Sequence, residues 1–130
     1  LLHEVDKLRP PYNVSVLNAE CALFALEHAD VFAQQAQQIC AERERLQHGL
    51  AAIAGLTPFV SDANMMLVRF AGASDAAAQA FEALKARKVL VKNVSKMHPL
   101  LANCLRLTVG TPDENTQLLA ALQAIQESRT

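Results

Sequence analysis

Residues 104–115 read CLRLTVGTPDEN, and this stretch decides the fold class. In its first half, apolar and polar or small residues alternate with a period of two, which is typical of a β-strand that buries one face. Arg106 therefore belongs to the strand face that points away from the core. The two expected faces are Leu105, Leu107 and Val109 toward the helices, and Cys104, Arg106 and Thr108 away from them.

The second half of the stretch predicts the start of a helix. Thr111 is a favoured N-cap residue, and Pro112 suits the first helical position. Glu114 lies three residues after the threonine and completes a capping box. The strand that carries Arg106 is thus expected to lead directly into a capped helix that buries Leu118, Leu122 and Ile125.

The rest of the chain divides into further helices and strands by the same periodicities. Helical spacing begins at Val14, where Leu17, Cys21, Phe24 and His28 share a face, and a longer helix is expected over about 31–53. Two strands, one helix capped by Ser74, one more strand and a polar loop then lead to residue 104. Their expected ranges are 57–60, 64–70, 74–87, 89–92 and 93–103. This order predicts an α+β fold, with a small, mostly antiparallel sheet and helices packed on one face.

Composition and charge exclude several classes of function. With 130 residues, of which 52% are hydrophobic, the chain is long enough for one compact domain. Its formal net charge of −1 argues against a nucleic-acid-binding protein, and no apolar run is long enough for a membrane span. The three cysteines lack metal-ligand or disulfide spacing and are typical of a reducing compartment.

Arg106 is the main candidate for a functional side chain. One interpretation is an arginine that pairs with a local acid or is solvated. The other is an anion receptor, because a guanidinium binds a carboxylate or phosphate through two parallel hydrogen bonds. Lys92 alternates with Leu90 and is expected to share the sheet face of Arg106. Two neighbouring cations without an acid would favour a bound anion between them.

The sequence contains no recognisable catalytic centre. Lys96 lies in the polar loop without features that would activate an amine, so we interpret it as a solvated lysine. The four histidines have no metal-ligand spacing, and there is no nucleophile elbow or phosphate-binding glycine loop. We therefore expect no catalytic residue, no metal site and no cofactor bound by this chain alone.

Four segments, taken together, resemble the histidinol-phosphate aminotransferases. They are RPPYN (9–13), NMMLVRF (64–70), VLVKN (89–93) and CLRLTVGTPDEN (104–115). The family depends on pyridoxal phosphate and has the aspartate-aminotransferase fold. The chain is similar to the C-terminal part of these enzymes over nearly its whole length.

The resemblance implies a domain organisation. Residues 14–130 would be the aminotransferase small domain, and residues 1–13 a connector from a missing large domain. The absence of a methionine at the first position also favours a processed chain or a piece of a longer one. The Schiff-base lysine, the aspartate that faces the pyridine nitrogen and the phosphate-binding groups would all belong to the large domain. The parent enzyme would be a cytoplasmic homodimer, and this chain alone would be inactive.

The resemblance also assigns roles to two residues. Arg106 matches the family arginine that binds the anionic group of the substrate, either the carboxylate of glutamate or the phosphate of histidinol phosphate. Lys92 takes the place of a second family arginine, so it keeps the charge but loses the bidentate geometry.

Three other functions stay open on the sequence. One is a purely structural interaction domain, which the glutamine-rich face of the helix over about 31–53 would suit. The chain could be a free-standing regulatory module in which Arg106 binds an anionic metabolite. It could also be the small domain of an aromatic-amino-acid aminotransferase, because those enzymes share much of the same pattern.

Overall fold

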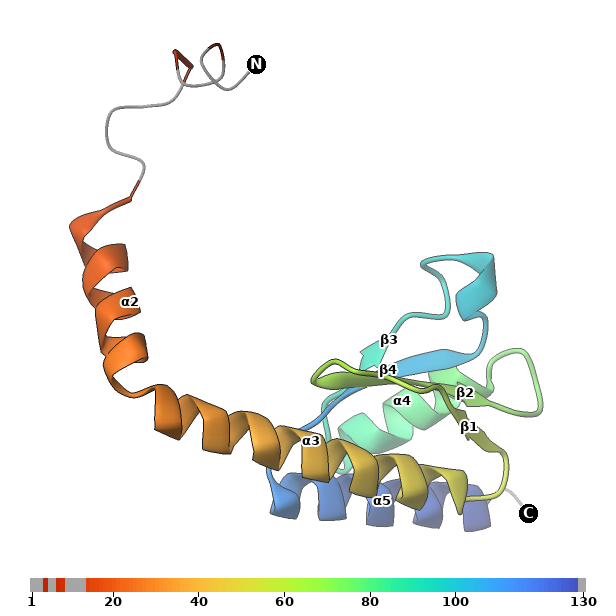
Figure 1. Ribbon diagram of the computed structural model, residues 1–130. Helices are drawn as coiled ribbons and strands as arrows, with labels where there is room; N and C mark the ends of the chain where they lie inside the picture. Colours follow the sequence, from red (N-terminus) through yellow and green to blue (C-terminus); the bar gives the residue numbers. More distant parts are fainter. Residues whose placement is uncertain (1–3, 5–6, 9–13, 129–130) are drawn as a thin grey trace. The chain divides into compact units, whose positions relative to one another are not determined.

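The computed structural model describes residues 4, 7–8 and 14–128 of the 130-residue chain (Figure 1). It separates into two compact units, residues 1–36 and 37–130, and each is described here by itself. The segment RPPYN and most of the expected connector, residues 1–13, lie outside the described residues, so the boundary at residue 14 stays a prediction. In the described part of the chain, no helix is long and apolar enough to cross a membrane.

The first unit is helical, as the sequence predicts. Helix α2 spans Val16–Glu27, and the side chain of Ser15 caps it by accepting a hydrogen bond from the backbone N–H of Asn18 at 3.2 Å. Helix α3 spans Ala29–Ala51 and contributes its first residues to this unit. None of the side chains of α2 is buried, although the helix is rich in apolar residues.

The second unit contains a four-stranded antiparallel sheet with strand order β1-β2-β4-β3. Its helices lie on one side of the sheet, which confirms the predicted α+β class (Figure 1). Besides the end of α3, the elements are β1 (Leu56–Pro58), β2 (Met65–Phe70), α4 (Ala76–Ala86), β3 (Lys92–Asn93), the 3-10 helix η1 (Pro99–Leu101), β4 (Cys104–Thr108) and α5 (Pro112–Glu127).

The core of this unit forms between one face of the sheet and the helices. The residues of β2 and β4 that join this core are those that alternation predicts, and α3, α4 and α5 complete the cluster. The predicted capping box at Thr111 and Glu114 is present and fixes the start of α5. The sheet contributes Met66, Val68, Phe70, Leu105 and Leu107, and the helices contribute Leu46, Leu50, Leu84, Leu118, Leu122 and Ile125.

The strand predicted over 89–92 is shorter than expected and shifted, because β3 includes only Lys92 and Asn93. The reason lies at the end of α4. Lys88 adopts a left-handed conformation with φ of 61°, and the N–H of Val89 donates to the carbonyl of Leu84 at 3.0 Å. This bond terminates the helix and withdraws Val89 from the sheet. Leu90 is 83% exposed.

The predicted cap of α4 by Ser74 is wrong. The helix begins after Asp75, and neither that side chain nor Ser74 caps it. The cap comes instead from Asn103, whose side-chain oxygen accepts from the N–H of Ala77 at 3.1 Å and whose amide donates to the carbonyl of Ala73 at 2.6 Å. The N-terminal end of α4 is therefore tied to Asn103, the residue that immediately precedes β4.

We predict that Asn103→Ala destabilises the fold. The change removes both side-chain hydrogen bonds and leaves alanine in a left-handed conformation, with φ of 57°. The loss should be about 1–3 kcal/mol in the free energy of urea-induced unfolding. Ser74→Ala is the control and should change that free energy by less than about 0.5 kcal/mol. Equal effects of the two changes would show that Asn103 is not the cap.

Candidate functional site

Arg106 lies at the centre of β4 and has a strand on each side. Its cross-strand partner on β2 is Leu67, and its partner on β3 is Lys92. Directly opposed residues project from the same face of a sheet. Arg106 and Lys92 therefore share the sheet face opposite the helices, as the sequence predicts. We refer to these two residues as the cation pair.

The cation pair is not neutralised by any acid among the residues that the structure describes. Arg106 is half-buried and Lys92 is exposed. Among the residues that the structure describes, none forms an ion pair or a side-chain hydrogen bond with either of them. The interpretation that Arg106 pairs with a local acid is thus not supported. Because like charges directly opposite each other are unfavourable, the arrangement favours an anion near both.

Arg69 is a third cation on the same face, but it is already engaged. Its Nη2 donates to the carbonyl of Leu100 at 2.7 Å, and its guanidinium carbon lies 5.2 Å from the centroid of the Phe59 ring. A cation over an aromatic face is stabilised by the ring quadrupole. Arg69 therefore links β2 to η1, and Arg106 and Lys92 remain the cations available to a ligand on this face.

One end of the outer face is covered, contrary to the expectation of an open surface. Cys104 points away from the helices and is nevertheless fully buried. The loop after β3 covers it: the N–H of Val94 and the hydroxyl of Ser95 both donate to the carbonyl of Cys104, at 3.3 and 3.1 Å. Lys96 follows in the same loop and is exposed, as expected. The cation pair is thus bordered on one side by an ordered loop.

A polar network joins α3 to the turn between β4 and α5. Oε2 of Glu42 accepts hydrogen bonds from Nη2 of Arg45 at 2.7 Å, from Nε of Arg45 at 3.1 Å and from the side-chain amide of Asn115 at 2.7 Å. Arg45 also donates to the carbonyl of Pro112 at 2.8 Å. This network was not predicted from the sequence. A signal was present, since Asn115 lies three residues before Leu118 on the buried stripe of α5.

Two carboxylates near this turn have lowered pKa values. The hydrogen bond from Arg45 is the largest cause of the lowered pKa of Glu42, followed by that from Asn115. The pKa of Glu114 is lowered mainly because it accepts a hydrogen bond from the backbone N–H of Thr111, at 2.8 Å. Each bond favours the ionised carboxylate.

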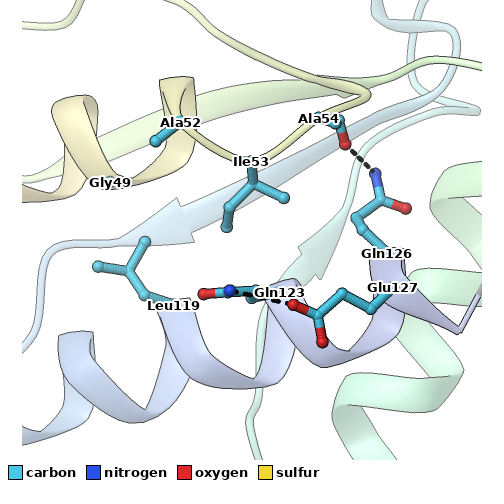
Figure 2. A pocket seen from close by; sticks show the side chains of 8 residues that line it. All are labelled: Gly49, Ala52, Ile53, Ala54, Leu119, Gln123, Gln126 and Glu127. Carbon is cyan, nitrogen blue, oxygen red and sulfur yellow. Dashed lines mark hydrogen bonds between the residues drawn. The ribbon is translucent and has the colours of Figure 1, made fainter.

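A groove between α3 and α5 lies away from the cation pair. Figure 2 shows this groove of about 500 Å³ between the end of α3 and α5, which both pack on the other face of the sheet. Its polar groups pair with each other: Gln126 donates to the carbonyl of Ala54 at 3.3 Å, and Gln123 donates to Glu127 at 3.1 Å. It has no cationic lining residue and does not extend the anion site.

The described residues do not fit pyridoxal phosphate. That cofactor needs a lysine amine for a Schiff base, together with groups for its ring nitrogen and its phosphate. Lys88 is the lysine that lines a described cavity, and the acid that lines the same cavity, Glu114, is already bonded to Thr111. Within the described ranges, no group of three or more histidine, cysteine or acidic residues could hold a metal ion.

Comparison with known proteins shows which proteins the chain is similar to. No family model matches the chain. It is 63% identical over 123 residues to the histidinol-phosphate aminotransferase of Polaromonas naphthalenivorans, covering 95% of this chain and 33% of that protein. The enzyme of the same name from Methylibium petroleiphilum is 66% identical over 125 residues, with 96% and 33% covered. The chain is similar to one third of a histidinol-phosphate aminotransferase.

Solved structures show the same fold at low sequence identity. The histidinol-phosphate aminotransferase of Clostridium acetobutylicum superposes with a TM-score of 0.81 at 20% identity, over 92% of this chain and 36% of that one. The Sinorhizobium meliloti enzyme, solved with pyridoxal-5'-phosphate, gives 0.76 at 23% identity, over 98% and 34%. These matches support the aminotransferase type of α+β fold.

We predict that folding stability falls in acid partly through Glu42. Because its pKa is lowered in the folded state from the ordinary value of 4.5, its contribution is complete above that pH. The contribution is then lost as the pH falls through the lower folded-state pKa. The free energy of urea unfolding should differ less between pH 7 and about pH 3 for Glu42→Gln than for the wild type.

The matched control for this measurement is Glu44→Gln. This residue is exposed on the same helix and takes no part in the network through its side chain, so the variant should keep the wild-type difference. A Glu42→Gln profile identical to the wild type would contradict the assigned role of the network.

Proposed function

We propose that this chain is the C-terminal small domain of a histidinol-phosphate aminotransferase and that Arg106 binds the anionic group of the substrate. The observation that carries the proposal is the cation pair, which lacks an acidic partner among the described residues. The reaction would be amino transfer from glutamate to imidazole-acetol phosphate, giving histidinol phosphate and 2-oxoglutarate. It would take place in the cytoplasm.

The two cations would contribute differently to binding. The guanidinium of Arg106 offers parallel N–H donors that match a carboxylate or a phosphate. It lies between two strands, so its backbone is fixed. Lys92 presents a point charge on a flexible stem near the edge of the sheet and would neutralise the second negative charge of a phosphate. Substrate-anion binding is thus assigned to Arg106, with Lys92 in support.

The catalytic chemistry would come from the rest of the enzyme. Pyridoxal phosphate stabilises the carbanion that forms during amino transfer. Since the described residues do not fit that cofactor, its lysine and phosphate-binding groups are assigned to a large domain. We therefore propose that this chain alone binds no pyridoxal phosphate and has no transaminase activity.

The exposure of helix α2 supports the proposal that a partner surface outside this chain covers it. Its apolar residues are distributed around the whole helix, and none is buried in the described structure. A helix that is apolar on all sides is typically buried on all sides in the complete protein. We propose that the large domain, and in the homodimer the second subunit, cover it. The exposed apolar residues include Val16, Leu17, Leu23, Phe24 and Leu26.

The alternatives are less well supported. A free-standing regulatory module has no parallel among eight curated relatives between 55% and 66% identical, which are all histidinol-phosphate aminotransferases. An aromatic-amino-acid aminotransferase would use the same arginine for a carboxylate. Activity with imidazole-acetol phosphate against an aromatic 2-oxo acid distinguishes the two enzymes.

We predict that Arg106→Ala in the complete enzyme raises the KM for both substrates. Loss of a charged bidentate contact of about 1.5–3 kcal/mol corresponds to more than a tenfold increase. Steady-state kinetics with glutamate and with imidazole-acetol phosphate measure the effect. Lys96→Ala removes an exposed loop cation and serves as the control with unchanged KM values. Unchanged KM values for both substrates in Arg106→Ala would refute the assignment.

We also predict that the 130-residue chain self-associates, because the apolar surface of α2 lacks its partner. Light scattering should give a mass above that of a 14.1 kDa monomer. A Leu17→Gln and Phe24→Gln double variant should lower it, and Glu20→Gln on the same helix should not. A monodisperse wild-type monomer would count against a buried role for α2.

A further inference from the structure

Asn115 is a buried polar side chain whose hydrogen-bonding groups are all engaged. It is 1% exposed. Its amide oxygen accepts from the N–H of Gly110 at 3.0 Å, and its amide nitrogen donates to the carbonyl of the same glycine at 3.0 Å. The remaining amide proton goes to Glu42 at 2.7 Å. The side chain thus pairs with one peptide residue as a neighbouring strand would.

The position of Gly110 explains what this pairing replaces. Backbone groups alternate between the two edges of a strand. The carbonyl of Cys104 faces β3, where it accepts from Val94, and the N–H of Val109 faces β2, where it donates to Asn64. By the same alternation, the backbone N–H and C=O of Gly110 face the β3 side, like those of Cys104 and Arg106. Asn115 therefore occupies the edge of β4 where a longer β3 would have continued.

The edge of β4 is open between its two supports, which are β3 and the side chain of Asn115. The register that pairs Lys92 with Arg106 would place Leu90 opposite Thr108, but β3 begins only at Lys92. A cleft of about 400 Å³ opens there, lined by Leu90, Thr108 and Gly110 among others. Arg106 is thus the last residue of β4 that pairs with β3, and the next support on this edge is the amide of Asn115.

We infer that Asn115 is a positioning residue for Arg106. Glu42 holds the Asn115 amide from α3, the amide holds Gly110, and Gly110 fixes the direction and twist of β4 beyond its short pairing with β3. The orientation of the Arg106 side chain follows from that twist. The inference rests on the proposed function, because it assumes that Arg106 binds an anion.

The test replaces the amide of Asn115 by groups that cannot make the same pairing. Asn115→Asp removes both donated bonds, places an acceptor against the Gly110 carbonyl, and sets a second carboxylate beside Glu42. Gln117→Glu makes the same amide-to-carboxylate change at an exposed position of the same helix and is the matched control. If Asn115→Asp does not fold, Asn115→Ser with Gln117→Ser gives the same comparison without the added charge.

The probe is inorganic phosphate, titrated into the 130-residue chain. The readouts are the NMR signal of the Arg106 guanidinium for the dissociation constant and urea unfolding for the folded fraction. Asn115→Asp should bind phosphate roughly tenfold more weakly than Gln117→Glu under conditions in which both are folded, because misalignment weakens a bidentate charged contact. A purely structural role for Asn115 would lower the urea midpoint and leave the dissociation constant of the folded protein unchanged.

The possible outcomes separate the inference from the proposed function. If wild-type protein and Arg106→Ala respond equally to phosphate, the anion site itself fails. If the wild type binds through Arg106 and the folded Asn115 variant binds as tightly as its control, the anion site stands and the positioning role is overturned. Weaker binding by the folded Asn115 variant alone supports the inference.

Discussion

The pairing of β4 on both of its edges is the constraint on which the site depends. β2 lies along one edge and the short β3 along the other, so alternation along β4 fixes which side chains enter the core. A slip of one residue would send Arg106 into the core and expose Leu105 and Leu107. The apolar face therefore specifies the register, and the register holds the guanidinium on the opposite face.

Local sequence was sufficient to predict the parts of the fold that are determined locally. The alternation of β4 and the Thr111 capping box involve neighbours along the chain, and both were predicted correctly. The errors arose where residues distant in the sequence determine where a helix or strand begins or ends. Val89 has a strand-like sequence but is held by the end of α4, and the helix expected to be capped by Ser74 is capped by Asn103. Propensity and pattern cannot report such tertiary competition.

The candidate site shows the same division. Alternation placed Arg106 on the outer face, and the match of Lys92 to that face followed from its own spacing. Asn115 is a polar residue in the buried stripe of α5, but its partner Glu42 lies 73 residues earlier. No local pattern connects the two. The role of Asn115 became visible only when the structure brought α3 against the turn after β4.

The asparagine contacts around β4 and the cation pair both bear on the proposed anion binding. Two directly opposed cations weaken a sheet, and a short β3 gives few hydrogen bonds to offset that repulsion. The surrounding structure compensates at both ends of β4, where Asn103 ties its start to α4 and Asn115 ties its end to α3. Because both supports lie on backbone groups rather than on the cations, the guanidinium and the ammonium keep their hydrogen-bonding capacity for a ligand. Binding of the proposed anion would relieve the repulsion without requiring the strand to move, as expected of a preorganised site.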